Sequence, residues 1–324
     1  MTFASVRAGI EHWAFRRTAP HPQALLRAGL GAFLLFYWGL KVGQVPALFS
    51  SEALWLPWPD ATWHPLFQWL TQAPSPALAY GIYAAFMLCL LCFAVGLRMR
   101  ETALLAAVFY VYYWLISLHL FPTSYDRLFP FLLVVMAFSA GDRALSVRMW
   151  WKYGSLWAWD EASVLGQRIV ALQVAFTYLG VGWQKMVLPA WQSGDVLAQS
   201  VMGIWGTPLA FWLTRWNVPA WVYDKLTFIV MALEFCLPIG LWVPRWQWLF
   251  FAMGAVFHIL IAVLMGIWWF LVLIPAYVAF IEPETLLAML RRVLPGIPES
   301  PGAPPSFSPR HFGLGRRRTM AAAE

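Results

Sequence analysis

The stretch Q-V-A-F-T-Y-L-G-V-G-W-Q-K-M-V-L-P-A-W-Q-S-G, Gln173–Gly194, decides how the rest of the chain is interpreted. It predicts an apolar helix whose small residues permit close packing. The last turns of this helix hold Gln184 and Lys185, and Pro189 ends it. A lysine this close to hydrocarbon is costly, so Lys185 either extends its ammonium to the lipid headgroups or has a specific role. We interpret the other segments as a membrane scaffold around this lysine.

The composition of the whole chain excludes a soluble domain. Hydrophobic residues make up 61% of the 324 residues, charged residues make up 11%, and the mean hydropathy is +0.64. A soluble domain of this length cannot bury so much apolar surface. The net charge of +7 comes from basic residues between apolar runs, which indicates membrane orientation and not a nucleic-acid partner. The expected fold class is all-α, a polytopic integral membrane helical bundle in contact with membrane lipid.

Eight apolar segments predict about eight transmembrane helices in a domain of residues 23–285. They cover approximately 24–45, 78–97, 102–121, 128–141, 164–188, 222–243, 246–264 and 267–281. The fourth and eighth are short, and the last two are weakly separated, so seven spans remain an alternative. Residues 1–22 predict an interfacial helix, and residues 286–324 predict a disordered basic cytoplasmic tail.

The distribution of basic residues predicts the orientation. With a cytoplasmic N-terminus, 17 of the 22 lysines and arginines fall inside, four fall outside, and Lys41 lies within the first span. The positive-inside rule then places both termini in the cytoplasm of a multi-pass protein of a plasma membrane or cell inner membrane. On the outer side, residues 46–75 and 189–220 are rich in tryptophan, and we expect interfacial helices there.

The ionisable residues of the predicted spans gather toward the outer leaflet. These residues are Lys41, His119, Asp126, Arg127, Lys185, Glu234 and His258. Such groups usually face the bundle interior and pair with one another, so one buried polar pocket open to the outside is expected. We expect Glu234 to pair with Lys41, Arg127 or His258. Glu234 should not contact Lys185 if Lys185 is a neutral base, because a carboxylate favours the ammonium form.

The same residues also have purely structural explanations. Lys41 can be a snorkelling anchor, Asp126 and Arg127 can pair with each other or cap a helix, and His119 can belong to an interfacial belt. The six histidines are too scattered to predict a metal site, and the chain has no catalytic-triad signature or phosphate loop. From the residues alone we predict a membrane protein with a pocket, but no particular reaction.

Three motifs resemble the HTTM family, horizontally transferred transmembrane proteins related to vitamin K-dependent γ-glutamyl carboxylase. They are Y-L-G-V-G-W-Q-K-M-V-L-P-A-W-Q-S-G, L-F-P-F-L-L-V-V-M-A-F-S-A-G-D at Leu128–Asp142 and F-H-I-L-I-A-V-L-M-G-I-W-W-F at Phe257–Phe270. The resemblance covers about residues 20–285. It implies that Lys185 is the base that deprotonates a reduced, vitamin K-like quinone and that His258 lines the pocket. Gln184 and Trp191, in the first motif, complete the predicted pocket.

Three classes of function remain open at this point. The resemblance favours a carboxylase-like, lyase-type membrane enzyme that modifies a peptide or protein. Tyr125 aligns with a histidine of the carboxylase active site, and the long lumenal region of that enzyme has no counterpart here, so glutamate carboxylation itself is not expected. A non-catalytic maturation or assembly factor for a peptide or partner protein is the alternative. A small transporter is less favoured because we find no inward-facing intramembrane charges or internal repeats.

Overall fold

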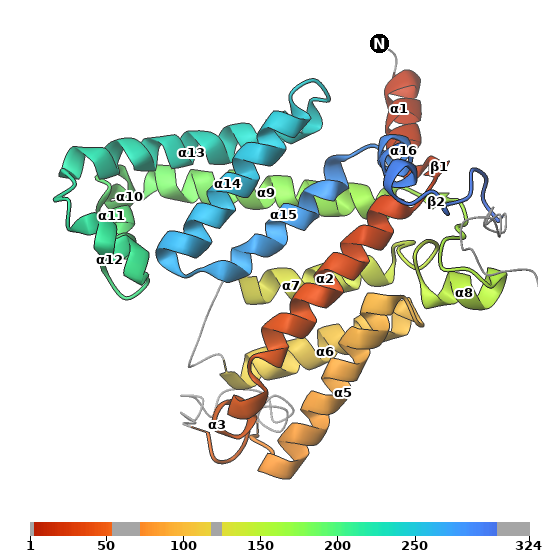
Figure 1. Cartoon of the computed structure of the whole chain (residues 1–324), viewed down its shortest axis with the longest axis horizontal. Helices are drawn as coiled ribbons and strands as arrows, with labels where there is room; N and C mark the ends of the chain where they lie inside the picture. Colours follow the sequence, from red (N-terminus) through yellow and green to blue (C-terminus); the bar gives the residue numbers. More distant parts are fainter. Residues whose placement is uncertain (1–2, 54–71, 118–124, 303–324) are drawn as a thin grey trace, which may run out of the picture.

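The computed structural model describes residues 3–53, 72–117 and 125–302, and its secondary structure is nearly all helical (Figure 1). The elements up to residue 163 are α1 (Phe3–Phe15), β1 (Arg17–Thr18), α2 (His21–Gly39), η1 (Val42–Gln44), α3 (Val45–Phe49), α5 (Pro76–Val95), α6 (Met99–Ser117), α7 (Tyr125–Ala137), α8 (Val147–Tyr153) and β2 (Ala162–Ser163). The later elements are α9 (Leu165–Val187), α10 (Pro189–Gln192), α11 (Asp195–Met202), α12 (Pro208–Thr214), α13 (Ala220–Trp242), α14 (Gln247–Met265), η2 (Trp268–Val272), α15 (Leu273–Ala276), η3 (Tyr277–Phe280) and α16 (Pro283–Val293). The expected helical class is confirmed, apart from the two-residue antiparallel pair β1–β2.

Three helices of the described part are long and apolar enough to cross a membrane, namely α5, α13 and α14. Two bent pairs also qualify, α2 with Val42–Phe49 at 44° and Trp268–Phe280 with α16 at 108°, which brings the candidate spans to five at most. Each of the eight predicted segments contains helical residues, but 96–97 and 138–141 lie beyond the ends of α5 and α7. In α9, polar residues such as Gln167, Arg168 and Gln173 reduce the apolar character. The count of about eight spans remains a prediction.

Helix α2 lies between two groups of helices in the main core (Figure 1). On one side it packs closely against α5, where a Cβ added to Gly31 would lie 2.6 Å from the Cβ of Ala94. On the other side it contacts η2, α15 and η3. Helix α9, which carries Lys185, packs against α13 and η3 in this second group. The two groups therefore share α2, and the lysine belongs to only one of them.

A smaller core closes the end of the molecule where α9 begins. It contains Trp159, Leu287 and Ile297, and it anchors the segment that follows α16. Trp159 Nε1 donates to the carbonyl of Pro298 at 3.1 Å, and Gly302 N–H donates to the carbonyl of Trp159 at 2.9 Å. The predicted disorder from residue 286 onward is therefore wrong for residues 286–302. The apolar face of α16 has a hydrophobic partner in this core, so the segment is folded.

The predicted interfacial regions are partly described. A helix occurs in the N-terminal region as α1, and its Ile10 and Phe15 are 59% and 56% exposed, which leaves them available to lipid. The stretch 189–220 forms the short helices α10, α11 and α12. Trp55, Trp58, Trp63 and Trp69 lie outside the described residues. The location of these regions at a membrane surface remains a prediction.

Candidate functional site

Lys185 and Glu234 form a buried ion pair between α9 and α13. Lys185 Nζ lies 2.5 Å from Glu234 Oε1, and the two residues are 9% and 3% exposed. The helices approach closely one turn before the lysine, because a Cβ added to Gly182 would lie 3.1 Å from the ring of Phe235. Two opposite charges removed from water require such a contact, since an unpaired buried charge is costly. The pair therefore links α9 to α13 through a buried polar contact.

This pairing bears on two expectations. Glu234 is buried and paired as predicted, but its partner is Lys185 and not Lys41, Arg127 or His258. The contact with Glu234 is also the one that a neutral Lys185 base should avoid, so it argues against a lysine that rests as the neutral amine. The physical reason lies in the helix ends, because α9 ends at Val187 whereas α13 begins at Ala220 and reaches Glu234 only in its middle. The end of α9 therefore lies beside the middle of α13, and α10–α12 occupy the space beyond it (Figure 1).

The motif around Lys185 also places an aromatic ring beside the ammonium. Lys185 Nζ lies 4.7 Å from the ring centre of Trp191, which follows in α10. The turn after α10 depends on Gly194, whose φ is +73°, because a Cβ there would lie 2.7 Å from the backbone nitrogen of Asp224. Gln184, in contrast, is exposed. Of the two predicted pocket residues in this motif, only Trp191 contacts the lysine.

A second buried polar cluster lies two helical turns earlier on α9. Tyr178 Oη contacts His258 Nε2 of α14, and it lies 2.6 Å from Tyr277 Oη of η3. The three residues are 4%, 2% and 0% exposed. Gly254 makes room for this contact, since a Cβ there would lie 2.3 Å from Tyr277 Oη. His258 is therefore brought to the same face of α9 as Lys185, as expected for a residue that lines the site.

The sequence interpretation missed both tyrosines of this cluster. The seven-residue spacing of Tyr178 and Lys185 places them on one helix face and was a usable signal for Tyr178. Tyr277 carried no comparable signal, because it belongs to a short irregular helix whose register the sequence does not define.

Two buried polar atoms of these clusters lack a hydrogen-bond partner within the described residues. They are Glu234 Oε2 and His258 Nδ1. Buried polar atoms are usually satisfied, so atoms without partners indicate positions where a ligand or water can bind. If Tyr178 donates to His258 Nε2, then Tyr277 donates to Tyr178, and the proton of a neutral His258 is on Nδ1. The site then presents one acceptor and one donor from neighbouring helices.

Of the other predicted pocket residues, the two with described side chains, Lys41 and Arg127, do not join this site. Lys41 Nζ lies over the rings of Tyr37 and Trp38, at 4.0 and 4.4 Å, where α2 meets η1. Arg127 is exposed at the start of α7. His119 and the side chain of Asp126 lie outside the described residues. Among the described side chains, the candidates for the single expected pocket are therefore reduced to Lys185, Glu234 and His258.

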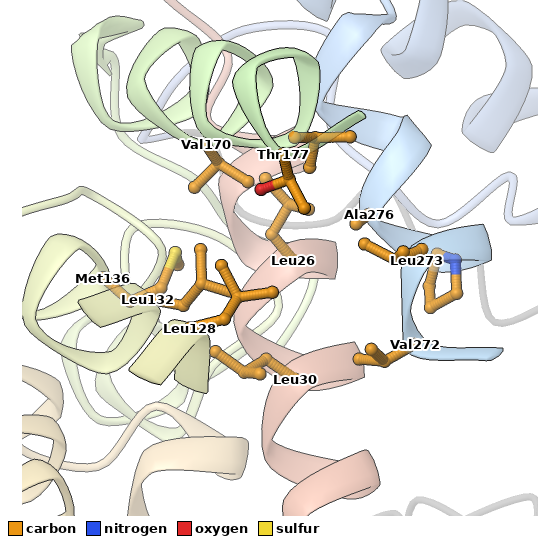
Figure 2. Close-up of a pocket in the computed structure, with 12 residues that line it drawn as sticks. Leu26, Leu30, Leu128, Leu132, Met136, Val170, Thr177, Val272, Leu273 and Ala276 are labelled. Atoms are coloured by element: carbon orange, nitrogen blue, oxygen red, sulfur yellow. The ribbon is translucent and has the colours of Figure 1, made fainter. Parts of the chain in front are cut away.

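An apolar cavity of about 40 Å³ lies beside the second cluster, between α2, α7, α9 and α15 (Figure 2). Figure 2 shows leucine and valine side chains directed toward it and the hydroxyl of Thr177 at its edge. Thr177 and Ala276 line it and directly precede Tyr178 and Tyr277. Sites for drug-sized ligands enclose about 300–1,000 Å³, so this cavity as it stands is too small for a quinone ring.

Comparison with known proteins assigns no family to this site. The chain gave no match to a family model, to a curated protein or to a solved structure. Within the described residues, no group of three or more His, Cys, Asp or Glu side chains is arranged to hold a metal ion. The arrangement itself offers acid–base chemistry, because a lysine, a carboxylate and a histidine are held in a region largely shielded from water.

Proposed function

We propose that this chain is a membrane enzyme that uses the Lys185–Glu234 pair to take a proton from a reduced, quinone-like cofactor. The observation that carries the proposal is the buried contact of 2.5 Å between Lys185 Nζ and Glu234 Oε1. The resemblance of the Lys185 motif to the HTTM family and the carboxylase supports it. In such an enzyme the proton removal activates the cofactor for modification of a peptide or protein.

The pair solves the problem that a protonated lysine is not a base. Lys185 would pass its Nζ proton to Glu234 Oε1, and the neutral Lys185 amine would then be available to take a proton from a hydroxyl group. The original Lys185 proton would be held on Glu234. A protonated carboxyl and a neutral amine are both tolerated in a low-dielectric site, whereas isolated charges are not.

A reduced quinone would supply a weakly acidic hydroxyl when bound, and the polar atoms without partners match its polar groups in chemistry, although its ring would need more room than the cavity beside Tyr178 offers. Glu234 Oε2 and His258 Nδ1 are buried and unpartnered among the described residues, so they are available to hold polar groups of such a ligand. Tyr178 and Tyr277 fix the ring of His258 and thereby its orientation. These residues would hold such a ligand, with its hydroxyl directed toward Lys185.

Infrared difference spectroscopy of the purified protein tests this proposal. On addition of a reduced naphthoquinone, we expect a protonated-carboxyl band that disappears in Glu234→Gln. Addition of the oxidised naphthoquinone is the control and should give no such band. Lys185→Arg keeps the positive charge but cannot release its proton, so it should bind the ligand without the band. A folded wild-type protein that binds no reduced naphthoquinone, or that shows the same band in Lys185→Arg, contradicts the proposal.

We further place this site near the outer leaflet of a plasma membrane or cell inner membrane, with eight passes and both termini in the cytoplasm. The basic residues support this arrangement, because the segments placed inside contain 17 of the 22 lysines and arginines. A substrate peptide would then be modified on the outer side of the membrane.

The non-catalytic alternative, a maturation or assembly factor, is favoured by one observation. The α11–α12 region exposes large apolar side chains, including Ile204 at 94%, Trp212 at 48% and Trp216 at 68%. Such a surface can contact a partner protein as well as lipid. If this alternative holds, Trp212→Ala with Trp216→Ala abolishes maturation of a genetically neighbouring peptide, measured by mass spectrometry, whereas Lys185→Arg leaves it unchanged.

A further inference from the structure

A second cavity, of about 540 Å³, lies at the opposite end of α9 from Lys185. The start of α9, the start of α6 and the segment after α7 all contribute to its walls. Its charged lining consists of Arg17, Arg100, Arg143, Arg148 and Asp142, which gives four positive charges against one negative. From the sequence, these arginines predicted only the orientation of the chain in a membrane. The fold brings them together around one cavity.

Two of the arginines converge without a carboxylate partner in the described part of the chain. Arg17 Nη2 and Arg143 Nη1 each donate to the same backbone carbonyl, that of Glu161, at 3.0 Å. A carbonyl carries no net charge, so it does not neutralise two neighbouring guanidinium groups. An anion between them would do so.

The remaining charges around the cavity already have partners. Arg148 is bonded to Asp142 at 2.6 Å, and Arg100 lies over the ring of Phe138 at 5.1 Å. Asp160 lies near Arg143, and its oxygens accept from Lys152 and Tyr153, each at 2.6 Å. Burial acts to raise the pKa of Asp160, but these hydrogen bonds and the nearby cations outweigh it, so the pKa lies below its ordinary value. Asp160 is thus already hydrogen-bonded to Lys152 and Tyr153. It does not neutralise the charges of Arg17 and Arg143.

The walls of this cavity are fixed before any ligand binds. Gln23, which is 1% exposed, donates from Nε2 to the carbonyl of Ser163 at 2.7 Å and accepts the N–H of Ala140 at 2.9 Å. Gly166, in the first turn of α9, packs so closely that a Cβ would lie 2.4 Å from Ser139 Cβ. The positive end of the 23-residue helix α9 is therefore held at the cavity beside the arginines.

Exposed aromatic side chains lie on the rim of the cavity and on the neighbouring helix. Phe138, on its rim, is 65% exposed, and the neighbouring helix α8 exposes Trp150 and Trp151 by 52% and 65%. Tryptophan beside arginine is typical of membrane–water interfaces. The cavity thus combines a positive interior with an apolar rim that can contact acyl chains.

We propose that this cavity binds a phosphate-type anion, either the phosphodiester of an anionic phospholipid headgroup or a free phosphate ester. Arg17 and Arg143 are its principal ligands, and Arg100 adds a third positive charge. The apolar rim favours the lipid as the source. This inference is independent of the function proposed for Lys185, because the two sites lie at opposite ends of α9.

The test compares phosphatidylglycerol, phosphatidylcholine and inorganic phosphate as ligands of the full-length protein in neutral detergent. Binding is measured by native mass spectrometry for the lipids and by thermal stabilisation for all three. Arg17→Gln with Arg143→Gln is the pocket variant. Arg7→Gln with Arg245→Gln is the control, because it removes the same charge from two exposed positions outside the cavity. Arg100→Gln is a second pocket variant that leaves the bonds to Glu161 intact.

We expect the wild type to prefer phosphatidylglycerol to phosphatidylcholine and the pocket double variant to bind it about tenfold or more weakly. The control variant should bind it as the wild type does, and Arg100→Gln should weaken it to a smaller degree. Stabilisation by inorganic phosphate with the same arginine dependence would identify a free phosphate ester as the source. Equal binding of the two lipids without any phosphate effect, or equal loss in the pocket and control variants, overturns the proposal. If the double variant does not fold, unchanged binding in Arg100→Gln overturns it.

Discussion

Lys185 Nζ lies 2.5 Å from Glu234 Oε1, although the lysine is near the end of α9 and the glutamate is in the middle of α13. The contact joins two helices that are separated in sequence by the three short helices α10–α12. It also makes the protonation of either residue dependent on the other. The packing of α9 against α13 and the proposed proton transfer therefore both depend on this one ion pair.

Removing one partner of this pair should destabilise the fold strongly. Glu234→Gln or Lys185→Met leaves a buried charge without its partner, which typically costs about 3–5 kcal/mol. We expect a clearly lower Tm in detergent for each single variant. The double variant Lys185→Met with Glu234→Leu should lower the stability by less than the two single substitutions do in sum. No buried charge remains in the double variant. Lys152→Met is the matched control, since its pair with Asp160 is more exposed to water and should contribute little to stability. A wild-type Tm for Glu234→Gln would show that the pair is not buried.

The close approach of α9 and α13 can be tested through two glycines of the same helix. Gly182→Leu forces a side chain against Phe235, and overpacking of this kind costs about 1–3 kcal/mol. At Gly180 a Cβ would meet nothing within 4 Å, so Gly180→Leu should be neutral or slightly stabilising through its helix propensity. Thermal unfolding of both variants provides the comparison. Equal effects would argue that the two helices do not pack through Gly182.

The hydroxyl of Tyr178 should contribute to stability through both of its contacts. Tyr178→Phe leaves His258 Nε2 and Tyr277 Oη without this partner, which costs about 1–3 kcal/mol for buried groups. A double-mutant cycle with Tyr277→Phe should give a coupling energy of about 0.5–3 kcal/mol. Tyr80→Phe, at a tyrosine that is 41% exposed, is the control. Additive effects of the two variants would show that the hydroxyls do not interact.

The proposed orientation predicts which residues react with a membrane-impermeant thiol reagent. Ser51→Cys should be labelled in intact cells, and Glu161→Cys, an exposed position on the segment proposed to be cytoplasmic, should be labelled only after lysis. Both variants need Cys236 replaced by serine, because this native cysteine is exposed. The reverse labelling pattern would move the Lys185 site to the cytoplasmic side.

The local sequence correctly predicted the helices. Apolar runs defined the segments, Pro189 marked the end of α9, and the apolar surroundings of Glu234 indicated that this carboxylate is buried and paired. These features follow from hydropathy and backbone chemistry, which act over a few turns of chain.

The tertiary structure alone decided which polar groups meet. Glu234 contacts Lys185 because Gly182 brings α9 and α13 together with their ends offset, and no local pattern encodes this offset. Likewise Arg17, Arg100, Arg143 and Arg148 come from separate segments, and they surround one cavity only because β1 pairs with β2 and Gln23 fixes the walls. The segment 286–302 is ordered because Leu287 of α16 belongs to the same buried cluster as Trp159. Each of these contacts joins residues distant in sequence, so it depends on how the helices pack and not on which helices form.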